Sequence, residues 1–359
     1  MEKKRAGVIG ATGMVGQRLA VLLARHPWFE VSALAASARS AGRTYAEAVS
    51  GRWAMDVDVP ENLRNVPVLD ASADFDAVAA AADFVFCAVD MKKEETRELE
   101  ERLAKAECPV ISNNSANRGT ADVPMLIPEI NAEHAAVIEA QRKRLGTERG
   151  FIAVKSNCSI QSYVPLLHPL LDMGLTRVHV CTYQAVSGAS KTLEGWPEMR
   201  DNVIPYIGGE EEKSEREPMK VWGRVRDGAI IDALSPVISA QCLRVPVSDG
   251  HMAAVFAEFD RPVSHEEIVR RWRTFSGKAQ ELELPSAPKQ FIHYFEQPDR
   301  PQTRLERDLE NGMAVSAGRL RVDEDGRRIR FIGLSHNTLR GAAGGGVLMA
   351  ELLAAEGIF

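Results

Sequence analysis

The sequence predicts an α/β protein of two domains, a doubly wound parallel sheet domain followed by an α+β domain with a mixed or antiparallel sheet. The first domain is predicted because strand and helix patterns alternate to about residue 155, and because a glycine-rich turn joins the first strand to the first helix. The second domain is predicted by a change to longer extended runs after that point. At 359 residues the chain is long enough for two cores.

The first element is a strand over residues 6–9, followed by the segment Gly10-Ala-Thr-Gly-Met-Val-Gly16 and a helix over residues 17–25. The glycine spacing is GxxGxxG, a variant of the commoner GxGxxG. Because backbone N–H groups at such a turn and at the helix N-terminus face a bound anion, this order predicts a Rossmann-like site for a dinucleotide pyrophosphate.

The second strand, residues 29–35, indicates which dinucleotide binds. A protein that prefers NAD usually has an acidic residue at the end of this strand for the ribose hydroxyls, and none is present here. Residues 36–42 instead offer hydroxyl groups and the Arg39 guanidinium, which suit a 2′-phosphate. The sequence therefore predicts NADP over NAD.

The first domain continues with a buried strand at 83–89, a charged helix at 92–107 and a strand at 108–111. The polar cluster 112–118, which ends in Arg118, follows that last strand. Since the carboxyl ends of parallel strands form the ligand crevice, this cluster is expected to face a ligand.

Cys158 lies where a short apolar strand, residues 150–154, leads into a segment with helical spacing, residues 159–173, that stops at Gly174. A helix N-terminus favours the thiolate, which is the nucleophilic form of cysteine. Taken alone, a cysteine at this position is better explained by burial in the core. The other polar residues of the chain favour the nucleophile.

The second domain is expected to contain extended runs at residues 177–185, 229–240, 252–259, 312–321 and 328–334. It also places Arg244 and His251 seven residues apart around turn-forming residues. Arginine can hold a carboxylate through two hydrogen bonds, and histidine moves protons near neutral pH. Residues 204–213 form an acidic turn into a helix, and residues 341–356 form a helical tail expected to pack on the first domain.

Together, a dinucleotide turn, a cysteine, an arginine and a histidine predict acyl transfer to a thiol followed by hydride transfer. The segment 187–192 lacks the Gly-Lys-Ser/Thr order of a phosphate loop, so nucleotide hydrolysis is not expected. The net charge of −6 gives no sign of a nucleic-acid or membrane partner. The five cysteines are scattered without metal-site spacing, which predicts reduced thiols in the cytoplasm and no metal. No signal peptide or membrane span is predicted.

The chain resembles the aspartate-β-semialdehyde dehydrogenases, most closely their archaeal and fungal branch. Seven segments carry the resemblance in family order, at residues 10–16, 122–129, 156–159, 184–188, 204–213, 244–251 and 336–344. The resemblance implies reduction of β-aspartyl phosphate by NADPH to aspartate semialdehyde and phosphate, a step towards lysine, methionine and threonine. It also implies an NADP-binding domain at 1–157 completed by 337–359, a catalytic and dimerisation domain at 158–336, and a homodimer or homotetramer.

The resemblance also implies residue roles. Cys158 is the nucleophile, His251 the acid and base, and Gln184 orients the acyl intermediate. Arg244 binds the substrate carboxylate and Glu210 its amino group. The residues implied to bind phosphate are Lys213, Arg118 and Asn157. The residues implied to hold NADP are Gly10, Thr12, Gly13, Met14, Val15, Ser37, Arg39, Ser40, Ser187, Gly188, Asn337 and Thr338.

Two segments depart from the family pattern. Residues 160–163 are bulkier and more polar than the expected small-residue stretch, and residues 344–346 are Gly-Gly-Gly in place of Gly-Ala-Ser. Two alternatives therefore stay open: a malonyl-CoA reductase of the same superfamily, and a non-catalytic NADP-binding regulator. The regulator is disfavoured because the nucleophile, histidine and arginine positions are all filled. A purely structural dimerisation protein ranks last, because it would need none of these groups.

Overall fold

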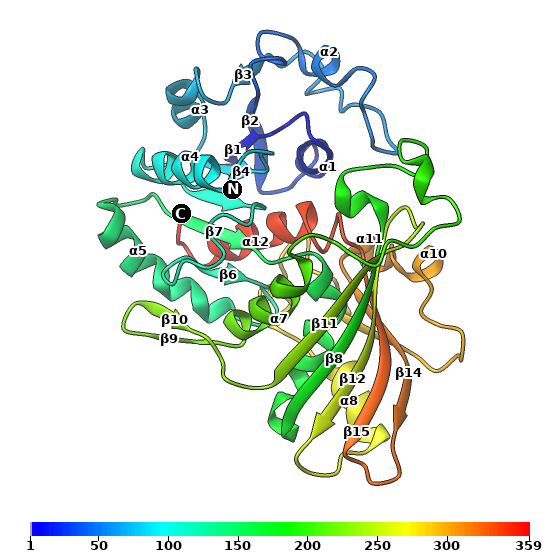
Figure 1. Cartoon of the computed structure of the whole chain (residues 1–359). Helices are drawn as coiled ribbons and strands as arrows, with labels where there is room; N and C mark the ends of the chain where they lie inside the picture. The colour runs from blue at the N-terminus through cyan, green and yellow to red at the C-terminus, as the bar shows by residue number, and fades with distance from the viewer. Residues whose placement is uncertain (1) are drawn as a thin grey trace.

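The computed structural model describes residues 2–359, and it contains two large sheets (Figure 1). Met1, the first residue of the predicted NADP-binding domain, lies outside the described residues. The first sheet has seven parallel strands in the order β3-β2-β1-β4-β5-β7-β6. Its strands are β1 (Lys4–Ile9), β2 (Phe29–Ala36), β3 (Val68–Asp70), β4 (Phe84–Cys87), β5 (Val110–Ser112), β6 (Met125–Leu126) and β7 (Ile152–Lys155).

Two of these strands, β3 and β6, were not predicted from the sequence. They span three and two residues, which is too short to show the alternation that identifies a strand. The helices of this part of the chain are α1 (Met14–Leu23), α2 (Tyr45–Val49), α3 (Phe75–Ala81), α4 (Lys93–Lys105), η1 (Ala132–Val137) and α5 (Ile138–Leu145).

The turn between β1 and α1 depends on two glycines. Gly10 has a φ of +86°, and a Cβ at this position would lie 2.2 Å from the carbonyl oxygen of Ala88. A Cβ on Gly16 would lie 2.2 Å from the carbonyl oxygen of Gly10. Glycine at these positions therefore lets the turn pass close to β4 and lets α1 pack against the turn.

The second sheet has six strands in the order β11-β8-β12-β15-β14-β13, and it is mixed. The pairs β8/β11 and β13/β14 are parallel, and the other three pairs are antiparallel. The predicted α/β fold class is thereby confirmed. The strands are β8 (Leu175–Gln184), β11 (Val237–Arg244), β12 (His251–Phe259), β13 (Ile292–Phe295), β14 (Val315–Val322) and β15 (Arg328–Ser335).

The run predicted at residues 229–240 is not one strand. Its first part, β10 (Ala229–Ile231), forms a separate hairpin with β9 (Arg224–Arg226), and β11 begins only at Val237. Pro236, immediately before β11, has no N–H for a ladder and is expected at such a boundary.

The helix predicted over residues 159–173 is also wrong as one element. The chain forms three short pieces, η2 (Ser159–Ser162), α6 (Val164–Leu167) and η3 (His168–Met173). Pro165 and Pro169 lack the N–H groups that a continuous helix needs. Gly174, with a φ of +87°, ends the segment where the sequence predicted.

The remaining helices are α7 (Glu210–Val221), α8 (His265–Thr274), α9 (Lys278–Glu281), α10 (Thr303–Glu306), α11 (Leu309–Gly312), α12 (Ala343–Ala355), η4 (Val186–Ala189) and η5 (Pro197–Met199). The C-terminal α12 returns to the first sheet, where it contacts β5, β7 and α1, as expected (red in Figure 1). Within residues 2–359, none of the helices has the length and apolar character needed to cross a membrane.

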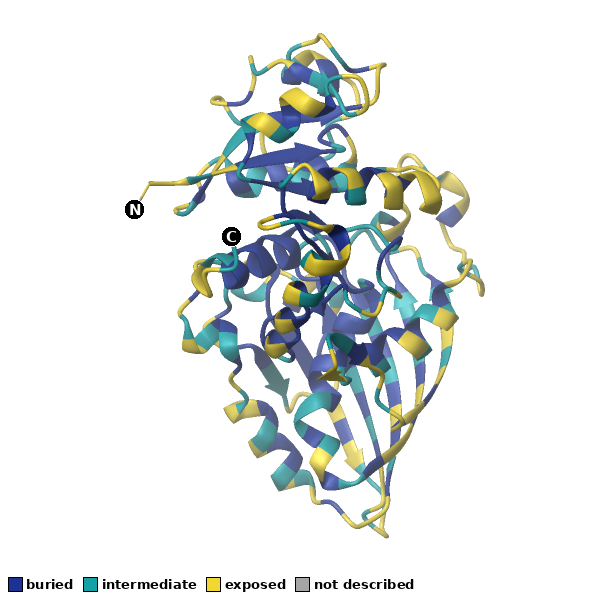
Figure 2. Cartoon of the chain, turned by 90° about the vertical axis from the view of Figure 1, so that its left-hand side faces the viewer, coloured by how far each residue is buried: buried dark blue, intermediate teal, exposed yellow. Residues whose placement is uncertain are grey.

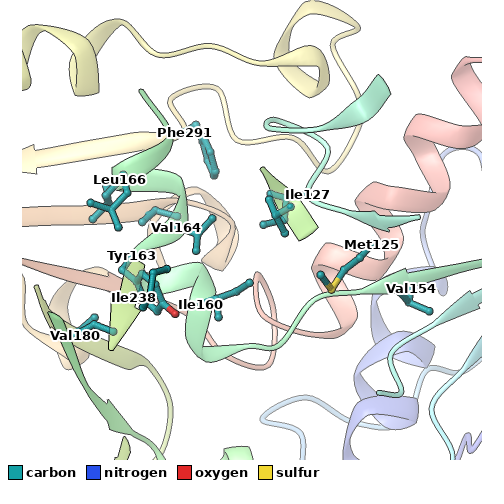
Figure 3. Packing of buried hydrophobic residues seen from close by; sticks show 14 of the residues in the cluster. Met125, Ile127, Val154, Ile160, Tyr163, Val164, Leu166, Val180, Ile238 and Phe291 are labelled. Atoms are coloured by element: carbon teal, nitrogen blue, oxygen red, sulfur yellow. The ribbon is translucent and has the colours of Figure 1, made fainter. Parts of the chain in front are cut away.

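The two sheets differ in burial. The central strands of the first sheet are mostly dark in Figure 2, whereas those of the second sheet alternate between buried and more exposed residues. One apolar cluster joins the sheets through the segment after Cys158. Figure 3 shows Ile160 and Tyr163 of this segment between Val180 of the second sheet and Val154 of the first. The segment that carries Cys158 is therefore anchored in a core shared by both sheets.

Candidate active site

The second sheet brings three of the predicted residues to one edge. Gln184 ends β8 and lies opposite Arg244, which ends the parallel strand β11. His251 begins the antiparallel strand β12, so it lies at the same edge. Cys158 reaches this edge from the other sheet, because it follows β7 after two residues.

Cys158 and His251 are in contact. The Cys158 Sγ lies 3.4 Å from Nε2 of His251, and the backbone N–H of Ala185 donates to Nδ1 of the same ring at 3.1 Å. Because Nδ1 accepts that bond, the proton of the neutral ring is assigned to Nε2, which faces the sulfur. Burial, with Arg244 and His336 nearby, lowers the pKa of His251 to about 3. The ring is therefore neutral and presents an N–H donor to the sulfur.

The Cys158 thiol is not held as a thiolate in this structure. Burial raises its pKa to about 11, and the Glu210 carboxylate adds to this, although the cations of Arg118, Lys155 and Arg244 act in the opposite direction. The expected preference for thiolate is therefore wrong for the protein without substrate. The helix turn that follows Cys158 is only four residues long, and its dipole does not offset the burial.

Glu210 connects three predicted residues. At the start of α7, its carboxylate accepts hydrogen bonds from Asn157 Nδ2 at 2.9 Å, Gln184 Nε2 at 3.3 Å and Lys213 Nζ at 3.2 Å. Asn157 Oδ1 accepts from the N–H of Ser159 at 2.7 Å. The side chain of Asn157 thus helps to position the turn around Cys158.

Glu217, seven residues further along α7, was not predicted. Its carboxylate accepts from Arg118 Nη1 at 2.9 Å and from the backbone N–H of Asn157 at 2.5 Å. It therefore ties Arg118 to the turn that carries Cys158. Helical spacing from Glu210 through Lys213 to Glu217 is the sequence signal that would have found it.

Arg244 is 5% exposed, and its Nη1 donates to the carbonyl oxygen of Ala185 at 2.6 Å. Gly188 lies directly over it, because a Cβ at Gly188 would be 2.8 Å from Arg244 Nη1 and 3.0 Å from His251 Nε2. Gly188 was expected on the cofactor side, and the structure places it against this pair. A side chain at position 188 would crowd both groups.

Asn337 links three loops around the site. It accepts from the backbone N–H of Gly250 and donates to Ser187 Oγ, both at 2.8 Å. Thr338 donates its backbone N–H to His336 Nδ1 at 3.3 Å. Gly341 lies against Cys158, since a Cβ at position 341 would lie 2.7 Å from Cys158 Cβ. The C-terminal segment thus closes the site beside Cys158.

A cavity of about 690 Å³ lies at the carboxyl ends of β1 to β4. Five residues predicted to hold NADP line it, namely Gly10, Thr12, Gly13, Ser37 and Arg39. Arg52 also lines it and was not predicted. Met14, Val15 and Ser40 are not among the lining residues, and buried Ser40 instead accepts a hydrogen bond from Arg52 Nη2 at 2.7 Å.

This cavity fits NADP. The N-terminus of α1 has no side-chain cap and no acidic residue in its first turn, so its N–H groups are available to a phosphate. Arg39 and Arg52 supply two cations near the end of β2. Asp70 also lines the cavity, but its Oδ1 accepts from the N–H groups of Ser72 and Ala73.

A second cavity, of about 700 Å³, is lined by Arg118 and Lys213 together with the unpredicted Arg216 and Lys220. These cations are suited to an anionic group, although the acidic residues Glu212, Glu217 and Asp232 also line the cavity. Within residues 2–359, no group of three or more His, Cys, Asp or Glu side chains is arranged to hold a metal ion.

The dinucleotide turn and the cysteine–histidine pair place the chain in the class of two-domain NAD(P)-dependent dehydrogenases. The semialdehyde dehydrogenase NAD binding domain matches residues 5–138, and the semialdehyde dehydrogenase dimerisation domain matches residues 167–340. With the relatives described next, these matches show that the chain belongs to the aspartate-semialdehyde dehydrogenase family, in the branch with archaeal and fungal members.

A relative from Archaeoglobus fulgidus, named aspartate-semialdehyde dehydrogenase, is 44% identical over 354 residues, or 98% of each chain. One of the same name from Aspergillus fumigatus is 42% identical over 99% of this chain and 98% of its own. The crystal structure of the Candida albicans aspartate-semialdehyde dehydrogenase with NADP has a TM-score of 0.87, at 38% identity and full coverage of both chains. The predicted family is confirmed.

Proposed function

We propose that the protein reduces β-aspartyl phosphate with NADPH, giving aspartate semialdehyde and phosphate. The observation that carries this proposal is the contact of Cys158 with His251 beside Arg244 and Glu210, in a chain of this family. A buried guanidinium and a buried carboxylate flanking one thiol suit a small substrate with a carboxylate and an ammonium group. A malonyl group would use Arg244 but leave Glu210 without a cationic partner on the substrate.

In this reaction, the Cys158 sulfur attacks the acyl carbon, the thiol proton passes to a phosphate oxygen of the substrate, and phosphate leaves to give a thioester. Arg244 binds the substrate carboxylate and Glu210 its ammonium group, while Gln184 orients the acyl group. The Nε2–H of His251 donates to the developing oxyanion or to the sulfur as it leaves. Arg118, Lys213 and Asn157 bind the phosphate, and Asn157 also holds the turn that presents Cys158.

NADPH, when bound, supplies the hydride that reduces the thioester to the aldehyde. Gly10, Thr12 and Gly13 would hold its pyrophosphate against α1, and Ser37 and Arg39 its 2′-phosphate. The segments that line the cavity would be supported, from outside its lining, by Met14, Val15 and Ser40. Ser187, Gly188, Asn337 and Thr338 would close the nicotinamide side.

We retain the domain division at 1–157 with 337–359 and at 158–336. Two observations support it. β7 is the last strand of the first sheet along the chain, and α12 packs against β5 and β7 of that sheet. We further propose a homodimer or homotetramer in the cytoplasm. The matched dimerisation domain supports the oligomer, as do the half-exposed Phe256 and Val237 on the open face of the second sheet.

The direct test is the reverse reaction, in which aspartate semialdehyde reduces NADP in the presence and absence of phosphate. Strong phosphate-dependent formation of NADPH is the expected result, with much weaker activity on NAD. Consumption of malonyl-CoA and NADPH without the first activity would assign the protein to the malonyl-CoA reductases. Binding of NADPH without either activity would instead support a regulator.

A further inference from the structure

Lys220 is a buried lysine near the end of α7, and the proposed mechanism does not use it. Its side chain is 6% exposed. Its Nζ donates to the backbone carbonyl oxygens of Arg118 and Thr120, both at 2.7 Å. Because burying an amine that can carry a charge is costly, this contact with the loop around Arg118 calls for an explanation.

Lys220 lies on the same face of α7 as three residues of the site. Four residues recur along the helix at intervals of three or four positions, which places them on one face. In chain order they are Glu210, Lys213, Glu217 and Lys220. Glu210 binds Lys213, and Glu217 binds the side chain of Arg118. Lys220 extends this face by one turn and reaches the backbone of Arg118, where Glu217 reaches its side chain.

The loop that carries Arg118 follows β5 and is held from the first sheet by Glu100 of α4. Glu100 is 0% exposed. Its carboxylate accepts hydrogen bonds from Asn114 Nδ2 at 3.2 Å and from Asn117 Nδ2 at 2.7 Å, and it also accepts from Ser112 Oγ. Glu100 thus fixes residues 112–117, and the contacts from α7 begin immediately beyond them.

α7 is also fixed relative to Cys158. Pro218 lacks the N–H that would bond the carbonyl oxygen of Ser214 four residues earlier in the helix. The hydroxyl group of Tyr163 donates to this oxygen at 2.7 Å, and Ser214 Oγ lies 3.3 Å from Ser159 Oγ. Tyr163 and Ser159 belong to the segment that follows Cys158. The charged face of α7 is therefore held in a defined position beside the nucleophile.

We propose that Lys220 is a positioning residue for phosphate, because it fixes the backbone of Arg118 to the helix that carries Lys213. Two of the N–H groups of its amine bond the loop, so Lys220 acts through Arg118 and makes no contact of its own with phosphate. The two cations that bind phosphate are thereby aligned with each other and with Cys158. This inference rests on the proposed role of Arg118 as a phosphate ligand.

The first test measures the KM for phosphate in the reverse reaction. Lys220→Met keeps the length of the side chain but removes its donors, and it should raise this KM about tenfold. The KM for NADP should stay near the wild-type value, because the cofactor cavity is lined by other residues. Lys220→Arg keeps donors for the two carbonyl oxygens and should recover most of the loss.

The matched control is Arg216→Met. Arg216 is on the same helix and lines the same cavity, so this variant removes a positive charge but keeps both bonds of Lys220. It should raise the KM for phosphate much less than Lys220→Met does. Equal increases in the two variants would overturn the proposal, since they would reflect only the charge of the cavity.

A double-mutant cycle separates positioning from direct contact. If Lys220 acts through Arg118, then Lys220→Met should add little to the KM for phosphate once Arg118 has been replaced by alanine. Losses that multiply would show that Lys220 binds phosphate independently of Arg118, and they would overturn the positioning role.

Hydrogen–deuterium exchange tests the loop without any substrate. The backbone N–H groups of Arg118 and Thr120 donate within the loop, to Ser115 and Asn117. In Lys220→Met these amides should exchange faster than in the wild type, whereas those of α12 should be unchanged. If that variant does not fold, Lys220→Gln, which keeps an amide donor on a shorter side chain, gives the same readouts.

Wild-type exchange of the loop in a folded Lys220 variant would overturn the proposal, because the loop would then not depend on Lys220. The exchange result does not require the proposed reaction. Faster exchange in a protein without phosphate-dependent oxidation of aspartate semialdehyde would refute that reaction and leave Lys220 as the residue that holds the loop.

Discussion

The second sheet has an end at which Gln184, Arg244 and His251 meet Cys158, and we call it the catalytic edge. The catalytic edge and the cofactor cavity are built in different ways. The cavity is lined by residues from one continuous part of the chain, and it combines the glycine turn and the uncapped start of α1 with side chains such as that of Arg39. The catalytic edge is formed by side chains from distant segments, and its charged groups already bind one another, as Glu210 binds Lys213 and Glu217 binds Arg118. Substrate must therefore compete with existing ion pairs at the catalytic edge, whereas the cavity presents unpaired donors. Substitutions should separate the two regions by their effects on turnover and on cofactor binding.

The largest expected effect lies at the catalytic edge. His251→Asn removes the N–H that faces the sulfur and should lower kcat by about 10² to 10⁴-fold. The affinity for NADPH, measured by quenching of tryptophan fluorescence, should remain near the wild-type value. Equal losses in kcat and in NADPH affinity would show that the two regions are not separable.

The opposite pattern is expected in the cavity. Arg39→Ala removes a charge-assisted bond to the 2′-phosphate and should raise the KM for NADPH by about 10 to 100-fold, with little change in kcat. The KM for NADH should change much less, because NADH has no 2′-phosphate. A similar increase for both cofactors would contradict the assignment of Arg39.

A smaller effect is expected from the unpredicted carboxylate. Glu217→Gln weakens the hold on Arg118 and on the turn before Cys158, and should raise the KM for phosphate in the reverse reaction by about tenfold. Glu212→Gln, on the same helix but without those bonds, is the control. If both variants behave alike, Glu217 acts only through the general charge of the cavity.

A separate effect, on stability in acid, comes from two buried histidines near the catalytic edge. His251 and His336 are buried, with pKa values lowered to about 3 and about 4. Below pH 6.5 the unfolded chain binds protons that these folded rings do not, so stability falls as the pH decreases from 6.5 towards 4. At pH 5 the cost is about 2 kcal/mol for each ring. Thermal unfolding at pH 7 and pH 5 should show the loss, and His336→Gln should reduce it.

The two regions also differ in how far the sequence predicts them. The glycine turn and the missing acid after β2 are local patterns, so the cavity and its preference for NADP could be inferred directly. Arg52 was missed because its place in the cavity depends on a loop that folds back against Ser40. β3 and β6 were missed because they are too short to show a period.

At the catalytic edge, the sequence predicted which side chains carry the chemistry, but it did not predict their hydrogen-bond partners or their protonation states. Glu217 was missed because the groups it binds, Arg118 and the backbone N–H of Asn157, come close to it only in the folded chain. The thiolate expected at Cys158 was wrong because burial outweighs a short helical turn. Only the folded structure shows such a balance between burial and local charge.

The central claim is that a thioester forms on Cys158, and a phosphate-free burst experiment tests it most directly. Aspartate semialdehyde and NADP are mixed with the enzyme in the absence of phosphate, and NADPH formation is followed by absorbance. The account predicts a burst of about one NADPH per chain, an acyl group on the Cys158 peptide, steady turnover once phosphate is added, and no burst in Cys158→Ala. Hydride transfer that requires phosphate in the first turnover, or a burst that persists in Cys158→Ala, would contradict it.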